Sequence, residues 1–93
     1  MADNSYTKVP VARLDYTWEW GPWLADVSDT IDSVTVTVPE GLTTVGDPVV
    51  DGGDVTQRVE GGVLNDAYKM VCRIQTVGGL IDEEPIYLVI RDK

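Results

Sequence analysis

The chain has 93 residues, 43% of them hydrophobic and 25% charged, which is the composition of one folded domain rather than of a disordered segment. It carries 16 acidic and 7 basic side chains, a net charge of -9, so nucleic acid and anionic membrane surfaces are excluded as expected partners. No apolar run approaches the roughly 20 residues of a membrane-spanning helix, and we expect no signal peptide, because the first residues are neither basic nor apolar.

The chain begins with a polar stretch that has no hydrophobic period. We predict that residues 1–12 form a flexible N-terminal arm and that residues 13–93 form a single domain. In residues 14–20, Leu14, Tyr16, Trp18 and Trp20 fall on one face of a predicted strand, which Gly21-Pro22 ends.

Residues 26–30 are rich in Asp and Ser and predict a turn, after which Val34, Val36 and Val38 alternate with polar residues in a second strand. Short strands are predicted at 42–45 and 48–50, separated by Gly46-Asp47. The Asp51-Gly52-Gly53-Asp54 stretch then predicts a hairpin turn into a strand at 55–59.

A central strand is predicted over residues 66–77, where Tyr68, Met70, Cys72 and Ile74 share one face. Gly78-Gly79 predicts a two-residue turn, so residues 80–90 should fold back antiparallel and form a central hairpin. Pro85 fits an edge position or a bulge within that last strand.

About seven short strands with no helical window predict an all-β fold, an Ig-like antiparallel β-sandwich. A small open barrel is the alternative. Cys72 lies on the apolar face of its strand, so we expect a buried, unreactive thiol. No disulfide can form within a chain that has one cysteine, and stability must come from packing.

The sequence offers little for catalysis. There is no histidine, so the usual proton carrier for acid-base and nucleophilic catalysis is missing, and a closed zinc site cannot form from one cysteine. Asp82, Glu83 and Glu84 supply adjacent acids, but neighbouring residues of a strand face opposite sides and rarely converge on one bond. We therefore predict no enzyme activity, no catalytic residues and no cofactor.

Two further sets of residues have both a plain and a functional interpretation. Asp26, Asp29 and Asp32 are weak calcium candidates, although a turn explains the same residues. Aromatic side chains at strand spacing are typical of a core, and a sugar-stacking platform is the alternative interpretation. For contacts with other proteins, the candidate residues are Trp20, Trp23, Asp82, Glu83 and Glu84.

Several short motifs follow one another in a characteristic order. They are Leu14-Asp15-Tyr16, Trp18, Trp23-Leu24, Asp29-Thr30-Ile31, Val38-Pro39, Gly41-Leu42, Gly61-Gly62, the alternating stretch from Tyr68 to Thr76, Gly79 and Ile81-Asp82-Glu83. Asp66-Ala67-Tyr68 is also similar to the tyrosine corner of Ig sandwiches, with Cys72 four residues beyond the tyrosine rather than two. In this order the motifs resemble a known family, the small virion proteins of tailed bacteriophages and prophages that are often described as fiber-tail adaptor proteins. The resemblance covers roughly residues 13–91.

This resemblance implies an Ig-like virion structural protein, a non-enzymatic adaptor that joins tail or neck and fibre components. It also implies synthesis in the host cytoplasm, assembly into the virion, and other virion proteins as partners, with multiple copies in a symmetric assembly. The long arm and Trp20 depart from the family pattern, which leaves a capsid decoration or head-tail connector protein as an alternative. From a different class, a carbohydrate or cell-surface binding module also stays open.

Overall fold

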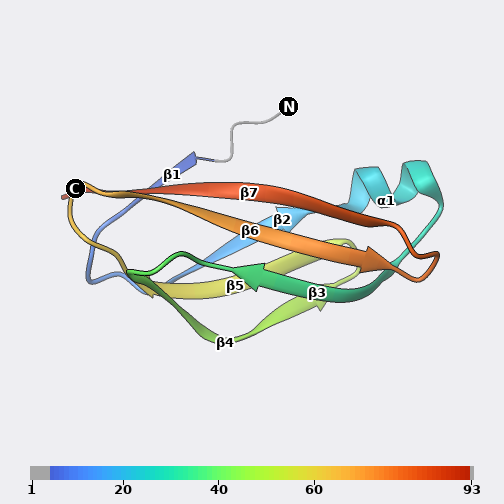
Figure 1. Cartoon of the computed structure of the whole chain (residues 1–93), viewed down its shortest axis with the longest axis horizontal. Helices are drawn as coiled ribbons and strands as arrows, with labels where there is room; N and C mark the ends of the chain where they lie inside the picture. The colour runs from blue at the N-terminus through green and yellow to red at the C-terminus, as the bar shows by residue number, and fades with distance from the viewer. Residues whose placement is uncertain (1–4, 93) are drawn as a thin grey trace.

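Two β-sheets pack face to face in the computed structural model, which describes residues 5–92 (Figure 1). One sheet has the strand order β1-β7-β6-β3 and the other β2-β5-β4, and all pairs are antiparallel except β1 with β7. The elements are β1 Ser5–Lys8, β2 Leu14–Glu19, α1 Gly21–Val27, β3 Ile31–Thr37, β4 Leu42–Asp51, β5 Asp54–Gly61, β6 Ala67–Thr76 and β7 Ile81–Ile90.

The strand order confirms the predicted all-β sandwich of the Ig type. The neighbours β3-β6-β7 correspond to the C-F-G sheet of an immunoglobulin domain and β2-β5-β4 to the B-E-D part of the other sheet. Within residues 5–92, no helix has the length and apolarity that crossing a membrane requires.

The core lies between the sheets and is built from alternating residues, as the sequence predicts. In β6, Tyr68, Met70, Cys72 and Ile74 are all buried, and their neighbours along the strand are not. From the other sheet, the indole of Trp18 is 3% exposed, and its Nε1 donates to the backbone carbonyl of Glu84 at 3.0 Å. Burial of these side chains is the main source of stability in a chain without a disulfide.

The tyrosine corner is present. The backbone N–H of Val63 donates to the Tyr68 hydroxyl at 2.8 Å, which ties the β5–β6 connection to the start of β6. Gly41 lies against the ring of Tyr68 and has a φ of 105°. A Cβ on Gly41 would lie 2.8 Å from the Tyr68 hydroxyl oxygen. Only glycine suits this position, because the backbone is left-handed and the ring fills the space.

The helix α1 corrects the expectation of a chain without helices. Pro22 sits in the first turn, where its missing N–H is not needed, and Leu24 is the buried residue of the helix. The helix ends at Ser28, whose left-handed φ of 53° lets the following amide bond back to Leu24. Seven residues with one buried position cannot display a helical period, so sequence pattern alone misses this element.

The structure also differs from the predicted arm, because Ser5–Lys8 forms β1 and pairs in parallel with Tyr87–Ile90. Lys8 is fully buried and its ammonium group donates to the carbonyls of Gly61 at 2.6 Å, Val9 at 2.9 Å and Pro10 at 3.3 Å. Lysine normally marks a solvated position, so nothing in the sequence indicates this anchor. Residues 1–4 of the predicted arm and Lys93 lie outside the described residues.

Two turn predictions need adjustment. The segments 42–45 and 48–50 belong to one strand, β4, whose register shifts between Val45 and Val49, so Gly46-Asp47 is an irregularity within a strand and not a turn. The β6–β7 connection spans residues 77–80 and is longer than the predicted two-residue turn at Gly78-Gly79. Hydrogen bonds between Thr76 and Leu80 close it. The predicted 51–54 hairpin is confirmed.

Candidate interaction surfaces

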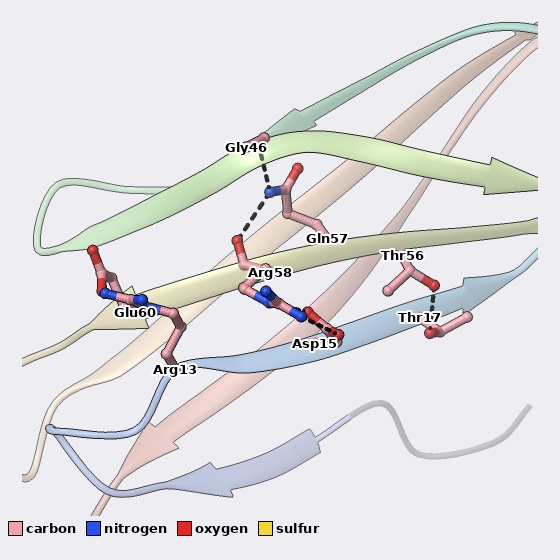
Figure 2. Close-up of polar contacts among 8 residues, drawn as sticks. All are labelled: Arg13, Asp15, Thr17, Gly46, Thr56, Gln57, Arg58 and Glu60. Atoms are coloured by element: carbon pink, nitrogen blue, oxygen red, sulfur yellow. Dashed lines mark hydrogen bonds and ion pairs between the residues drawn. The ribbon is translucent and has the colours of Figure 1, made fainter.

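The outer face of the β2-β5-β4 sheet carries a ladder of paired polar side chains (Figure 2). Arg58 on β5 holds Asp15 on β2 with two bonds, Nε to Oδ1 at 2.9 Å and Nη2 to Oδ2 at 3.2 Å. One step along the same strands, the hydroxyls of Thr17 and Thr56 are 2.8 Å apart. Cross-strand pairs of this kind stabilise a sheet modestly, and they set the register of β2 on β5.

These pairs leave little for a partner to bind. Hydrogen bonds from Arg58 are the main reason that the pKa of the exposed Asp15 carboxyl is held below its usual value. Arg13 at the start of β2 is likewise engaged, with Nε and Nη2 each 2.8 Å from Glu60. The charges of Arg58, Asp15, Arg13 and Glu60 are therefore matched within the chain, and these pairs stabilise the sheet.

A shallow groove crosses the same face. The paired Asp15 and Arg58 line it, together with the irregular part of β4. Asp15, Arg58 and Thr56 are already paired, the two valines are aliphatic, and Asp47 is an exposed carboxylate. The residues that line it are Asp15, Val45, Asp47, Val49, Thr56 and Arg58.

At the far end of the sandwich, α1 and the β6–β7 turn lie together (Figure 1). Asp29, just after the helix, accepts hydrogen bonds from the amide of Gly78 at 3.2 Å and from its neighbour Thr30 at 2.8 Å. The Val77 amide donates to the carbonyl of Thr30 at 3.0 Å. Hydrogen bonds from the Thr30 amide, which is the largest cause, from the Thr76 side chain and from the Gly78 amide lower the pKa of the Asp29 carboxyl. The bonds made by the Gly78 and Val77 amides hold the turn against the α1–β3 connection.

The calcium candidates are not brought together. Asp26 points from the exposed side of α1, Asp29 holds the β6–β7 turn, and Asp32 lies at the register shift in β3. Among residues 5–92, no group of three or more His, Cys, Asp or Glu side chains lies in a position to hold a metal ion.

The aromatic candidates mostly lie inside. Trp20 is 3% exposed, and Trp23 is half-buried against it with ring centroids 5.7 Å apart. The core interpretation of the aromatics therefore holds for Trp18 and Trp20, which cannot stack on a sugar as they lie. Of the interaction candidates, only the partly exposed Trp23 and the acids of β7 can be reached from outside.

The three adjacent acids of β7 face different sides, as expected for a strand. Glu83 lies opposite Arg73 and forms an ion pair with it at 3.3 Å, while Glu84 lies opposite the buried Cys72. These three acids therefore do not converge on a common point.

The thiol of Cys72 is buried, as predicted. Burial raises its pKa to about 11, and the neighbouring Trp20 indole offsets part of that rise. A thiol with this pKa is almost entirely protonated at neutral pH and is a poor nucleophile.

Sequence reasoning missed the exposed apolar side chains of the β6–β7 turn. Val77 is 68% exposed, Ile81 62% and Leu80 43%. We interpreted these residues as the ends of strands, yet large aliphatic residues that flank a glycine pair in a turn are themselves unusual. That pattern was the available signal for an interaction surface.

The comparison with known proteins identifies a family for this sandwich. No match was found among curated proteins. The sequence matches a family described as podophage GP4 fiber-tail adaptor protein gp77 over residues 8–89, which runs from the end of β1 into the end of β7. The chain therefore belongs to the podophage GP4 fiber-tail adaptor protein gp77 family.

Proposed function

We propose that the chain is a structural component of the phage virion, a non-enzymatic adaptor that joins the tail or neck to the fibre. The observation that carries this proposal is the family match, which covers nearly the whole sandwich. The match therefore extends over both sheets and is not confined to one segment. On this proposal the chain is made in the host cytoplasm and is then built into the particle.

The physical properties of the domain suit a joint. The molecule measures 42 × 27 × 18 Å, and its two sheets are locked to each other by the Trp18–Glu84 hydrogen bond and a continuous core. A rigid domain fixes the orientation of one neighbour relative to the next, and it loses little conformational entropy when it assembles. The net charge of -9 then favours neighbours with complementary basic surfaces, repeated around a symmetric particle.

A phage that carries an early stop codon in this gene tests the proposal. Grown without complementation, it should yield particles that have heads and tails but lack fibres, and a plasmid copy of the gene should restore the fibres. In images of complete particles, density for the chain should lie between tail or neck and fibre. Particles that carry normal fibres without the chain, or density for the chain on the capsid, would refute the adaptor role.

A further inference from the structure

The charges of this molecule are separated along its length. We define the α1 end as residues 19–32, 51–54 and 77–82, which comprise the β2–β3 connection with α1, the β4–β5 turn and the β6–β7 turn. Among the described residues, this end contains no lysine or arginine. Its acidic residues are Glu19, Asp26, Asp29, Asp32, Asp51, Asp54 and Asp82.

Some of these acidic residues lie opposite one another and so destabilise the fold. In the β2-β5-β4 sheet, Glu19 lies directly opposite Asp54, and Asp54 lies directly opposite Asp51. Residues opposite each other on adjacent strands have Cβ atoms about 5 Å apart, and like charges in that position destabilise a sheet. The next polar rows of the same sheet are matched pairs, so the acid row is a local exception.

No cation of the described chain relieves this repulsion. The ion pairs join Arg13 to Glu60, Arg58 to Asp15 and Arg73 to Glu83, and all of them lie outside the α1 end. At the opposite end the charges are balanced, for example by Arg13 with Glu60. The unmatched carboxylates therefore have a counter-charge only if another molecule supplies one.

The same end exposes apolar surface. Val77, Leu80 and Ile81 on the β6–β7 turn are exposed, and so is Val27 at the end of α1. An apolar centre flanked by charge is typical of a protein–protein interface.

This end is also held in one conformation. Asp29 and Thr30 bind the β6–β7 turn, and the amide of Trp20 donates to the carbonyl of Gly53 at 2.8 Å, which binds α1 to the β4–β5 turn. A surface that is ordered before it binds loses less conformational entropy on binding.

We propose that the α1 end is the docking face of the adaptor for a virion protein whose surface has an apolar patch flanked by Lys and Arg. The inference rests on the proposed function and names the face that carries it. A second copy of the chain cannot use the same face in a symmetric dimer, because two sets of unmatched carboxylates would meet.

The test uses particles that lack the chain and adds back purified full-length protein, measuring the concentration that half-saturates binding between about 0.05 and about 0.3 M salt. One variant, Asp51→Asn with Asp54→Asn, removes charge from the acid row. A second, Val77→Ser with Ile81→Ser, removes apolar surface. The matched control, Glu40→Gln with Asp66→Asn, removes the same charge from exposed positions at the opposite end.

We expect the acid-row variant to bind about tenfold more weakly at low salt, with a flatter dependence on salt, because it loses steering and pairing with the basic partner. The apolar variant should weaken by at least about tenfold and keep the salt dependence of the natural protein. The control should bind within about twofold of the natural protein. Thermal melts should show the acid-row variant to be at least as stable as the natural chain, since it removes like-charge repulsion.

The outcomes separate the two proposals. If the natural chain does not bind the particles, the adaptor function itself fails. If the natural chain binds and both α1-end variants bind equally well, the adaptor function stands and this docking face is wrong. A dimer of the free chain that the apolar variant disrupts would also overturn the proposal, by assigning the face to self-association.

Discussion

The indole N–H of Trp18 on β2 donates to the carbonyl of Glu84 on β7, and so joins the two sheets by one hydrogen bond across the sandwich. Trp20, two residues along the same face, is equally buried, but its indole nitrogen has no hydrogen-bond partner within the described part of the chain. The two side chains therefore have similar burial and different polar roles.

This difference predicts unequal effects of Trp18→Phe and Trp20→Phe. Both variants lose buried volume, but only Trp18→Phe leaves a carbonyl without its donor, which costs about 1–3 kcal/mol. We expect Trp18→Phe to be less stable than Trp20→Phe by about that amount in urea unfolding at neutral pH. Equal unfolding free energies would show that the inter-sheet bond contributes nothing to stability.

Lys8 anchors β1 by donating to three backbone carbonyls. Lys8→Met keeps the apolar stem but removes the donors, so we expect a loss of about 1–3 kcal/mol in the free energy of unfolding. Hydrogen exchange should accelerate most in the amides of Ser5–Lys8 and their partners on β7. The exposed Lys69→Met serves as the control, and equal exchange of β1 in both variants would contradict the anchoring role.

Gly53 and Gly21 differ in the space that surrounds them. A Cβ on Gly53 would lie 2.6 Å from the Cα of Gly21, which is backbone and cannot rotate away, whereas a Cβ on Gly21 would have no atom within 4 Å. We expect Gly53→Ala to displace α1 and destabilise the fold by about 1–3 kcal/mol. Gly21→Ala should be neutral or stabilising by up to about 1 kcal/mol. Thermal melts of both variants check this, and matching melting temperatures would refute it.

Because the Cys72 thiol is buried, the stability of the fold should depend on pH in the alkaline range. Its pKa is raised from 9.0 to about 11 in the folded chain, so the unfolded chain loses the thiol proton first. The contribution of the protonated thiol to the free energy of unfolding is therefore complete below pH 9 and is lost as pH rises toward 11. Burial also lowers the pKa of Lys8 and raises that of Tyr16, so these two groups add their own dependence on pH. The difference between natural protein and Cys72→Ala isolates the thiol.

We expect the stability advantage of the natural protein over Cys72→Ala to shrink by roughly 2–3 kcal/mol between pH 9 and pH 11. Urea unfolding at a series of pH values measures it. A difference that stays constant across this range would show that the thiol titrates normally in the fold.

Much of the sandwich was predictable because successive residues of a strand point to opposite faces, which gives the sequence a hydrophobic period of two. The alternation of Tyr68, Met70, Cys72 and Ile74 needs only local backbone geometry, and so does the hairpin turn at residues 51–54. The helix α1 was not predictable, because with a single buried residue it has no period to detect.

The sequence by itself determined that this chain is all-β, with an apolar alternation in its central strands, a lone thiol facing inward and a large excess of acidic residues. Tertiary structure decided that Lys8 is a buried anchor, that Trp20 is a core residue, and that Glu19, Asp54 and Asp51 form one row. The physical reason is the distance along the chain over which each feature is set. Which face of a strand a side chain occupies follows from the neighbouring residues of that strand. A row of charges across three strands depends instead on the register between segments that are distant along the chain.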